Sequence, residues 1–238
     1  MIGGTTDLVG LLRDPKVGSL SPRMQNAAFA ALALDIAYVP LGVAPELLAD
    51  AVRGLVALGF VGANVTTPHK RAVVALCDEV EGGVESVNTL VISDGRVLGS
   101  STDTEALGER RPGKAAVIGA GGAATAWIAE LEARGTEVTV FARQGEWPPR
   151  TNGAELVVHA TPVKHELLFE PQAGQLVVDL AYRAAGGDTA HAAAAREAGS
   201  ELIDGLDVLV AQGAASFERW TGVPAPVEVM RAAVRSAA

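Results

Sequence analysis

The stretch GANVTTPHKRAV, residues 62–73, brings a lysine and several polar side chains together where a predicted strand gives way to a predicted helix. Thr67 and Pro68 are typical of a helix start, with the threonine as N-cap and the proline as first helical residue. Lys70 then falls at the third helical position, where the helix dipole opposes a cation at a cost of about 0.3–1 kcal/mol. The same field makes the ammonium a readier proton donor. The sequence therefore predicts acid–base chemistry at Lys70, with an ordinary surface lysine as the alternative.

Four further polar side chains lie at or after the ends of predicted strands: Asn64, Thr66, Asn88 and Asp103. Ligand sites of α/β proteins gather where strands end, so we expect these side chains near Lys70. A carboxylate close to the ammonium would hold it in place, which makes Asp103 its natural partner. The alternative for Asp103 is an N-cap of the segment 104–108.

Ser19 and Ser21, in the motif SLSP, are two more hydroxyls with a possible role in binding. They also have a structural interpretation, because Ser21 followed by Pro22 is a good start for a helix over residues 21–34. The local sequence alone leaves both interpretations open.

A glycine-rich turn follows the apolar run AAVIG of residues 115–119 and precedes the helical pattern TAWIAELEARG. Its residues 119–124, GAGGAA, fit the pattern G-x-G-x-x-A in the strand–turn–helix context of a dinucleotide site. Gly119 permits the tight turn, Gly121 lets backbone N–H groups approach a pyrophosphate, and Ala124 lets helix and strand pack closely. We therefore predict a bound dinucleotide here.

The end of the next predicted strand, residues 137–142, indicates which dinucleotide is bound. NAD-selective sites place an acidic residue there for the ribose 2′-hydroxyl, whereas NADP sites place a cation for the 2′-phosphate. This strand is followed by Arg143, and the first acidic residue is Glu146. The planar fork of an arginine binds two phosphate oxygens at once, so NADP is favoured. The alternative is a solvated surface arginine.

The surrounding elements predict an α/β protein with two lobes. Strands at 7–12, 37–43 and 60–65 alternate with helices at 21–34 and 45–59, and a hairpin joins 86–92 to 96–100. After the charged connector 108–114, short apolar strands separated by turns or helices indicate a parallel sheet covered on both faces. We predict these strands at residues 115–119, 137–142, 155–160, 175–181 and 201–204. Helices over 205–220 and 226–238 close the chain.

The composition narrows the class of protein further. A net charge of −9 disfavours nucleic acid and anionic membrane surfaces as partners. A single cysteine, Cys77, excludes an internal disulfide, and neither a signal peptide nor a run of about 20 apolar residues is present. We therefore expect a soluble cytoplasmic protein. The four histidines show no metal-ligand spacing, so no metal site is predicted; they are His69, His159, His165 and His191.

Taken in order, the motifs resemble those of shikimate dehydrogenases along nearly the whole chain. They are SLSP (19–22), NVTTPHK (64–70), SVNTL (86–90), STD (101–103), GAGGAA (119–124), ATP (160–162), DLAY (179–182) and GLDVLVAQGAASFERWTG (205–222). The resemblance implies a substrate-binding domain of residues 1–103 plus 206–238 and a Rossmann-type NADP-binding domain of residues 104–205. It implies an oxidoreductase acting on a CH–OH group, which reduces 3-dehydroshikimate reversibly to shikimate with NADPH. This reaction belongs to chorismate and aromatic amino-acid biosynthesis.

The resemblance also implies roles for individual residues. Lys70 and Asp103 correspond to the catalytic pair. Seven residues correspond to substrate-binding positions: Ser19, Ser21, Asn64, Thr66, Asn88, Tyr182 and Gln212. Eight correspond to cofactor-binding positions: Gly119, Ala120, Gly121, Gly122, Ala123, Arg143, Thr161 and Gly205.

The chain departs from the family pattern at several points. Ser101 stands where an asparagine is usual, and Ala142-Arg143-Gln144 replaces the usual Asn-Arg-Thr. Arg183-Ala184 replaces a usual Asn-Pro, and the chain is shorter than is usual for the family. Two alternatives remain, a quinate/shikimate dehydrogenase of broader substrate and cofactor use and a non-catalytic NADP-binding homologue. The expected state is a monomer or a homodimer.

Overall fold

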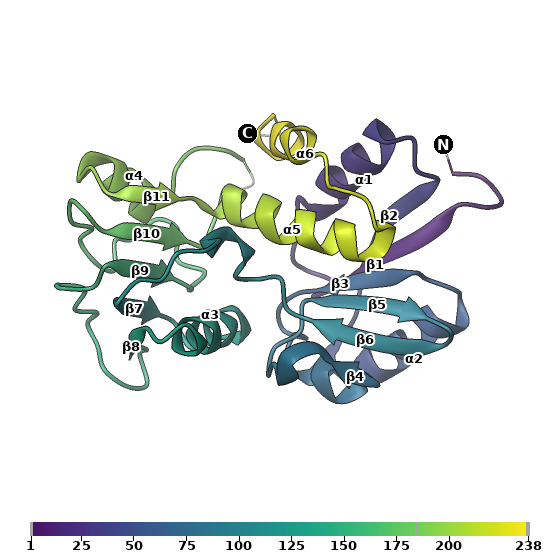
Figure 1. Ribbon diagram of the computed structural model, residues 1–238, viewed down its shortest axis with the longest axis horizontal. Coiled ribbons are helices and arrows are strands. Elements are labelled where there is room, and N and C mark those ends of the chain that lie inside the picture. Colours follow the sequence, from purple (N-terminus) through teal and green to yellow (C-terminus); the bar gives the residue numbers. More distant parts are fainter. Residues whose placement is uncertain (1, 184, 237–238) are drawn as a thin grey trace. The chain divides into compact units, whose positions relative to one another are not determined.

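The computed structural model describes residues 2–183 and 185–236, which form two compact units. The first comprises residues 2–102 with 210–236, and the second residues 103–209 apart from 184 (Figure 1). The closing helical segment thus belongs to the first unit, as the sequence predicts. The predicted domain boundaries, after residue 103 and after residue 205, stay a prediction.

The first unit is built on a six-stranded mixed sheet with the order β2-β1-β3-β5-β6-β4. Its strands are β1 (Asp7–Arg13), β2 (Ile36–Gly42), β3 (Gly62–Val65), β4 (Glu79–Val80), β5 (Thr89–Ser93) and β6 (Arg96–Ser100). Its helices are α1 (Ser21–Ala31), α2 (Leu48–Ala57), α6 (Val227–Arg235) and most of α5 (Gly205–Thr221). Short 3₁₀ turns lie at Pro45–Leu47, Ala72–Leu76 and Glu81–Gly83.

Helices cover this sheet because each carries a buried apolar stripe. On α2, Leu48, Val52 and Leu55 recur at the spacing of one helical face and join the core beneath the sheet. On the helix α5, Phe217 stacks on Phe29 of α1 with ring centroids 5.2 Å apart. The first unit therefore has its own core.

The second unit is a parallel sheet with the order β11-β10-β9-β7-β8. Its strands are β7 (Lys114–Ile118), β8 (Glu137–Phe141), β9 (Leu156–His159), β10 (Leu176–Asp179) and β11 (Glu201–Ile203). Its helices are α3 (Gly122–Ala133) and α4 (Ala190–Glu197), with a 3₁₀ turn at Glu105–Leu107. The chain runs from β7 outward to β8 and then returns past β7 to β9. The strand order thus reverses at β7, where doubly wound sheets bind ligands.

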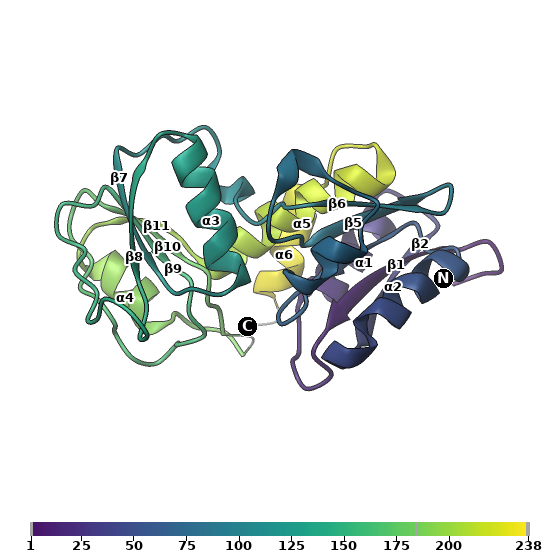
Figure 2. The same cartoon turned by 90° about the horizontal axis from the view of Figure 1, so that it is seen from below.

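Successive residues of these strands enter two different cores, which explains their near-continuous apolar sequences. Val117 and Val158 pack with Trp127 of α3, whereas Ile118 and Val157 pack with Ala195 of α4. Figure 2 shows the sheet between these two helices. The predicted parallel sheet covered on both faces is confirmed.

Two predicted helix starts are wrong. No helix begins at Thr67 or Pro68, which lie in a turn before the 3₁₀ segment. The reason is that the carbonyl of Lys70 accepts a hydrogen bond from the N–H of Val87 at 2.9 Å, which ties the turn to the chain entering β5. In α1, Ser21 is the first helical residue rather than the N-cap, which is Leu20.

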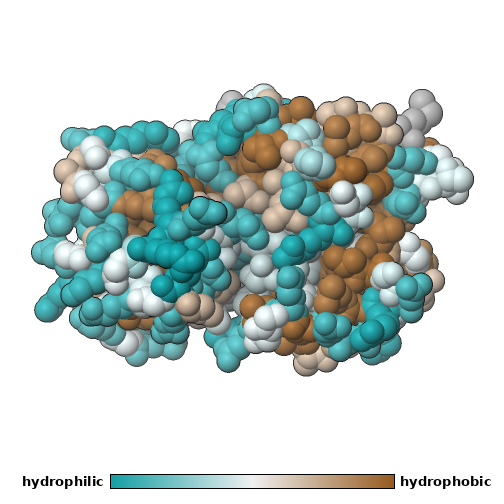
Figure 3. All heavy atoms as spheres, viewed as in Figure 1, coloured by the Kyte–Doolittle hydropathy of each residue, from teal (hydrophilic) through white to brown (hydrophobic). Residues whose placement is uncertain are grey.

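Within the described residues, no helix has both the length and the apolar character needed to cross a bilayer. On the face drawn in Figure 3, apolar surface is more extensive over the first unit than over the second. Scattered exposed leucine and valine side chains are common on folded proteins, so this distribution does not single out a site. Buried polar groups and cavities are more informative.

Candidate active site

A network of buried amides and hydroxyls lies where β3, β5 and α5 meet in the first unit. Asn64 is its centre and is only 5% exposed. The Asn64 Oδ1 atom accepts a hydrogen bond from the Tyr38 hydroxyl at 2.8 Å, and its Nδ2 donates to the carbonyl of Asn88 at 3.0 Å and to Ser216 Oγ at 3.0 Å. The register of β3 and β5 places Asn64 opposite Thr89, whose Oγ1 also accepts from Asn64 Nδ2 at 3.2 Å. Every polar atom of this amide is thus held.

Asn88 extends the network toward the end of β6. Its Oδ1 accepts from the backbone N–H of Thr102 at 2.8 Å and from the hydroxyl of Thr89 at 2.9 Å. Its Nδ2 donates to Thr102 Oγ1 at 3.0 Å and to Gln212 Oε1 at 3.4 Å. The structure thus brings together the predicted residues Asn64, Asn88 and Gln212.

Several members of this network were not predicted from the sequence. They are Tyr38, Thr89, Thr102 and Ser216. One signal was available: Gln212 and Ser216 are four residues apart and share a face of α5, so the buried serine could have been inferred from the predicted glutamine. Thr102 gives no such signal, because it contacts Asn88 and Gln212 only in the folded chain.

The serines of SLSP lie beside the same network. Ser19 Oγ donates to Ser21 Oγ at 3.1 Å and accepts from the Ser21 N–H at 3.1 Å. Burial raises the pKa of the Tyr38 phenol far above its ordinary range, and a hydrogen bond with Ser21 partly opposes this rise. Tyr38 therefore stays neutral, so it can serve as a hydrogen-bond donor and acceptor between Ser21 and Asn64. The pair of serines and the network form one continuous polar region.

Lys70 is half-buried in the first unit, in the turn after β3, and Asp103 is 8% exposed at the start of the second unit. Since no α-helix begins at Pro68, no helix dipole acts on the Lys70 ammonium as the sequence predicted. Thr66 fixes the preceding backbone: its N–H donates to the Leu12 carbonyl at 3.0 Å, and its own carbonyl accepts from the His69 N–H at 2.9 Å. The predicted pairing of Lys70 with Asp103 stays a prediction.

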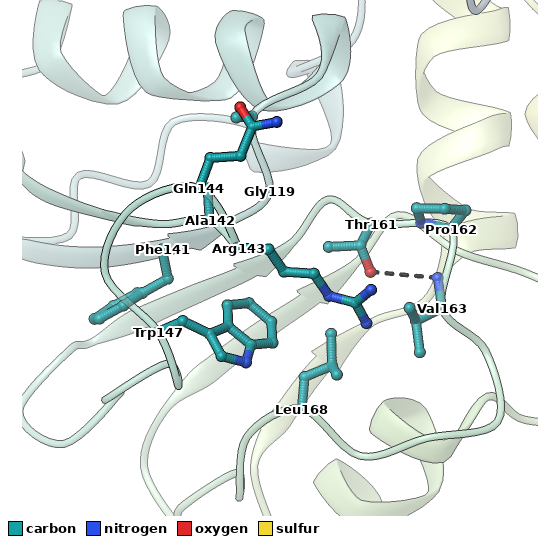
Figure 4. Close-up of a pocket in the computed structure, with 11 residues that line it drawn as sticks. Gly119, Phe141, Ala142, Arg143, Gln144, Trp147, Thr161, Pro162, Val163 and Leu168 are labelled. Carbon is teal, nitrogen blue, oxygen red and sulfur yellow. Dashed lines mark hydrogen bonds between the residues drawn. The ribbon is translucent and has the colours of Figure 1, made fainter.

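A separate cavity of about 400 Å³ lies in the second unit, at the carboxyl ends of β7, β8 and β9 (Figure 4). Residues that follow these three strands form most of its wall. The wall is made by Gly119, Ala120, Phe141, Ala142, Arg143, Gln144, Trp147, Thr161, Pro162, Val163 and Leu168. The cavity thus lies where the strand order reverses.

The glycine turn after β7 is built for close backbone approach. Gly119 has a φ of +127°, and a Cβ there would lie 2.6 Å from the Ala160 carbonyl oxygen. Only glycine fits this conformation and this space. Gly121 is the N-cap of α3, and no side chain caps that helix. The helix therefore begins with backbone N–H groups of the kind that bind a pyrophosphate. The cavity and this turn together fit a dinucleotide.

Arg143 reaches across the cavity. Its guanidinium points into the space between Trp147 and Thr161 in Figure 4, and its Cζ lies 5.9 Å from the centroid of the Trp147 ring. This contact orients the arginine by a cation–π interaction. Trp147 was not predicted, and its nearness to Arg143 in sequence is the only signal that could have suggested it.

The predicted cofactor residues fall into three groups. Gly119, Ala120, Arg143 and Thr161 line the cavity. The residues Gly121, Gly122 and Ala123 form the start of α3 and are absent from the described lining. Gly205 is buried at the start of α5, where a Cβ would lie 2.3 Å from the Ala181 carbonyl oxygen, and it is also absent from that lining.

A predicted substrate residue and an unpredicted polar cluster also lie in the second unit. Tyr182, predicted to contact substrate, has the Lys164 ammonium 5.9 Å from its ring centroid. A buried cluster of His159, Asp179 and His191, with side-chain donor atoms within 4.8 Å of one another, was not apparent from the spacing of the histidines. His159 and Asp179 end neighbouring parallel strands and His191 lies on α4, so the three side chains meet only in the folded chain.

Two family models match parts of this chain. Residues 14–90 match the model of the shikimate dehydrogenase substrate binding domain, and residues 205–235 match that of the shikimate 5′-dehydrogenase C-terminal domain. A relative from Anaeromyxobacter sp. (strain Fw109-5), named shikimate dehydrogenase (NADP(+)), is 42% identical in an alignment covering 98% of each chain. The chain belongs to the shikimate dehydrogenase family.

Solved structures of family members have the same fold. The shikimate dehydrogenase of Aquifex aeolicus superposes with a TM-score of 0.87 at 30% identity, covering 99% of this chain and 100% of that one. The shikimate 5-dehydrogenase of Thermus thermophilus, solved in complex with NADP(H) and shikimate, has a TM-score of 0.85 at 31% identity and covers 98% and 100%. The family resemblance predicted from the motifs is confirmed.

Proposed function

We propose that this protein is a shikimate dehydrogenase, an NADP-dependent oxidoreductase that interconverts 3-dehydroshikimate and shikimate in chorismate and aromatic amino-acid biosynthesis. The observation that carries the proposal is the 42% identity, over 98% of both chains, with a relative named shikimate dehydrogenase (NADP(+)). The structure supports it with a buried polar network in one unit and, in the other, a cavity of about 400 Å³ beside the glycine turn at Gly119.

Lys70 is the proposed proton donor. Bound NADPH supplies the hydride that reduces the ketone carbon. Negative charge then grows on the ketone oxygen, and the Lys70 ammonium stabilises that charge and gives the oxygen its proton. Asp103 is proposed to hold the ammonium in place through opposite charge. In the reverse direction the neutral amine of Lys70 takes the proton from the substrate hydroxyl.

The polar network is proposed to recognise the substrate. Neutral amides and hydroxyls suit a ring that carries several hydroxyl groups, and an analogue lacking one of them would leave a buried partner unpaired. We assign this recognition to Asn64, Thr66, Asn88 and Gln212, with Tyr182 as a further contact. Ser19 and Ser21 are proposed to donate hydrogen bonds to the substrate carboxylate.

The cavity of the second unit is proposed to bind NADP. Gly119 and Ala120 line it beside the start of α3, whose residues Gly121–Ala123 would contact the pyrophosphate. The Arg143 guanidinium would pair with the 2′-phosphate, and the described lining of the cavity includes no acidic residue to favour a free 2′-hydroxyl. Thr161 and Gly205 complete the proposed cofactor residues. We further propose that the protein is cytoplasmic, because its single cysteine suits a reducing compartment, and that it is a monomer or a homodimer.

An absorbance assay at the nicotinamide band tests the function directly. Shikimate and quinate are each supplied with NADP and with NAD, which gives four pairings. We expect the highest kcat/KM for shikimate with NADP. Higher kcat/KM with quinate or with NAD would favour a quinate/shikimate dehydrogenase instead, and no turnover in any pairing would favour a non-catalytic homologue.

A further inference from the structure

The buried cluster in the second unit joins the last residues of two neighbouring strands. The register of β9 and β10 pairs His159 with Asp179, and both side chains are fully buried. His159 Nδ1 lies 2.8 Å from Asp179 Oδ1, and its Nε2 lies 2.5 Å from Thr161 Oγ1. A chain of hydrogen bonds therefore runs from Asp179 through His159 to Thr161, which lines the cofactor cavity.

The direction of each hydrogen bond in this chain is fixed by the groups around Asp179. Its Oδ1 also accepts from the N–H of Ala181 at 3.0 Å, and its Oδ2 accepts from the hydroxyl of Thr189. The Thr189 hydroxyl donates its hydrogen to Asp179 Oδ2, while its oxygen accepts from the Ala192 N–H as the N-cap of α4. A carboxyl group that accepts on both oxygens is the ionised form and has no proton to give. His159 Nδ1 therefore carries a proton and donates it to Asp179.

This bond sets the tautomer of His159. We take His159 to be the neutral imidazole, which has one protonated nitrogen, so with the proton on Nδ1 the Nε2 atom is an acceptor. The hydroxyl of Thr161 must then donate to His159 Nε2. The Thr161 oxygen also accepts from the Val163 N–H at 3.3 Å, as Figure 4 shows. Its only hydrogen is used inside the protein, and one lone pair remains available to the cavity.

The hydrogen bonds that His191, His159 and Asp179 already make argue against a metal ion in the cluster. The His191 ring lies 3.9 Å from that of His159 between centroids, and its Nε2 accepts from the Leu168 N–H at 2.9 Å. The donor atoms of His159 and Asp179 are likewise engaged in hydrogen bonds. A cation would have to displace several of these bonds, whereas the cluster as it stands fixes both Thr161 and the backbone of Leu168 in the cavity wall.

From these contacts we infer that His159 and Asp179 are positioning residues that turn the Thr161 hydroxyl into an acceptor-only group of the cofactor site. Such a group pairs with a hydroxyl of a dinucleotide ribose and disfavours a phosphate oxygen, which also offers only lone pairs. The inference rests on the proposed binding of NADP in this cavity. It assigns the Thr161 hydroxyl the role of hydrogen-bond acceptor toward the cofactor. It also gives a role to His159 and Asp179, which are absent from the described lining of the cavity.

The first test uses two substitutions, one that removes the Thr161 hydroxyl and one that removes the imidazole of His159 that orients it. In Thr161→Val the Kd for NADPH, measured by the fluorescence of the bound nucleotide, should rise roughly threefold to tenfold. In His159→Asn the Thr161 hydroxyl is no longer held, so a similar rise is expected. The double variant should be no weaker than either single variant, because both changes remove the same interaction. His165→Asn is the control, since His165 is exposed, and its Kd should equal that of the wild type.

The second test reads the tautomer in the unaltered protein and so does not depend on the variants folding. Nitrogen-15 NMR of the wild-type histidines should show His159 with a protonated Nδ1 and an unprotonated Nε2. A proton on His159 Nε2, or a Kd unchanged in Thr161→Val, would overturn the inference while leaving the proposed function intact. Failure of the wild type to bind NADPH at all would instead overturn the proposed function.

Discussion

At the scale of single residues, Arg143 is the side chain proposed to select NADP over NAD. It is held over the Trp147 ring and lines the cavity, whose described lining includes no carboxylate. In Arg143→Ala the KM for NADPH should rise roughly tenfold or more, because a charge-assisted hydrogen bond to the 2′-phosphate is lost. The KM for NADH should stay nearly constant. Both constants come from initial rates with 3-dehydroshikimate saturating.

The control for this prediction is Arg150→Ala. Arg150 lies in the same loop and is absent from the described lining of the cavity. Its removal should change neither KM. Equal effects of Arg143→Ala on NADPH and NADH would contradict a contact between Arg143 and the 2′-phosphate.

Ser216 tests whether the network in the first unit recognises substrate. Its hydroxyl is fully buried and accepts from Asn64 Nδ2 at 3.0 Å while donating to the Gln212 carbonyl at 2.9 Å. In Ser216→Ala the amide of Asn64 loses an acceptor, so the free energy of unfolding should fall by about 1–2 kcal/mol. The KM for shikimate should rise several-fold at constant KM for NADP.

Ser93→Ala serves as the comparison, because Ser93 is an exposed serine of the β5–β6 hairpin. Urea unfolding and steady-state kinetics of both variants give the required quantities. A loss of stability in Ser216→Ala with an unchanged KM for shikimate would mean that the network supports the fold alone.

At the scale of elements, strands were predicted more accurately than helix starts. Buried strands such as β7 and β9 have continuous apolar sequences that have few other interpretations. The prediction of a helix from Pro68 was wrong because a Thr-Pro pair indicates only the local preference of the backbone for a helix start. The competing hydrogen bond from the Val87 N–H to the Lys70 carbonyl comes from a residue 17 positions later. No local pattern contains that bond.

The candidate site was also predicted only in part from the sequence. Asn64, Asn88 and Gln212 were found through motifs, and they do meet in one network. Thr102 and Tyr38 were missed because a threonine or tyrosine in or beside a strand is ordinary, and their polar partners meet them only in the folded chain. The contact of His159 with Asp179 was missed for a related reason, since β9 and β10 bring together residues 20 positions apart.

Helix α4 carries a pH-sensitive group, His191. Burial lowers the pKa of its imidazole from 6.5 to about 4, and the Asp179 carboxylate opposes the shift. Between these two values the unfolded chain binds a proton that the folded chain does not. The free energy of unfolding therefore rises with pH in this window, and the contribution of His191 is lost as the pH falls from 6.5 to 4.

The variant His191→Phe should remove this contribution. Phenylalanine keeps an aromatic ring beside Phe169, which lies 5.0 Å from the His191 ring between centroids, and it has no proton to bind. Urea unfolding at several pH values from about 4 to 7.5 should show a smaller loss of stability on acidification in the variant than in the wild type. Parallel curves for the two proteins would assign the acid sensitivity to other groups.

At the scale of the whole molecule, the chain combines two separately built α/β units, each with its own core and its own polar site. The class and the parallel sheet followed from alternation of apolar runs and helices along the chain. The family followed from motifs spread over nearly its full length, and the alignment with the Anaeromyxobacter relative covers 98% of it. The chemistry of these motifs requires one acid–base group, and Lys70 is the residue to which the proposed reaction assigns it.

Proton transfer by Lys70 is tested most directly by the turnover of Lys70→Ala. We expect kcat for shikimate oxidation with NADP to fall roughly 10²- to 10⁴-fold, because the hydroxyl proton has no acceptor. The Kd of shikimate, measured by calorimetry, should change little. Lys114→Ala, which removes an exposed lysine at the start of β7, should match the wild type. A kcat in Lys70→Ala equal to that of the wild type would contradict the proposed mechanism.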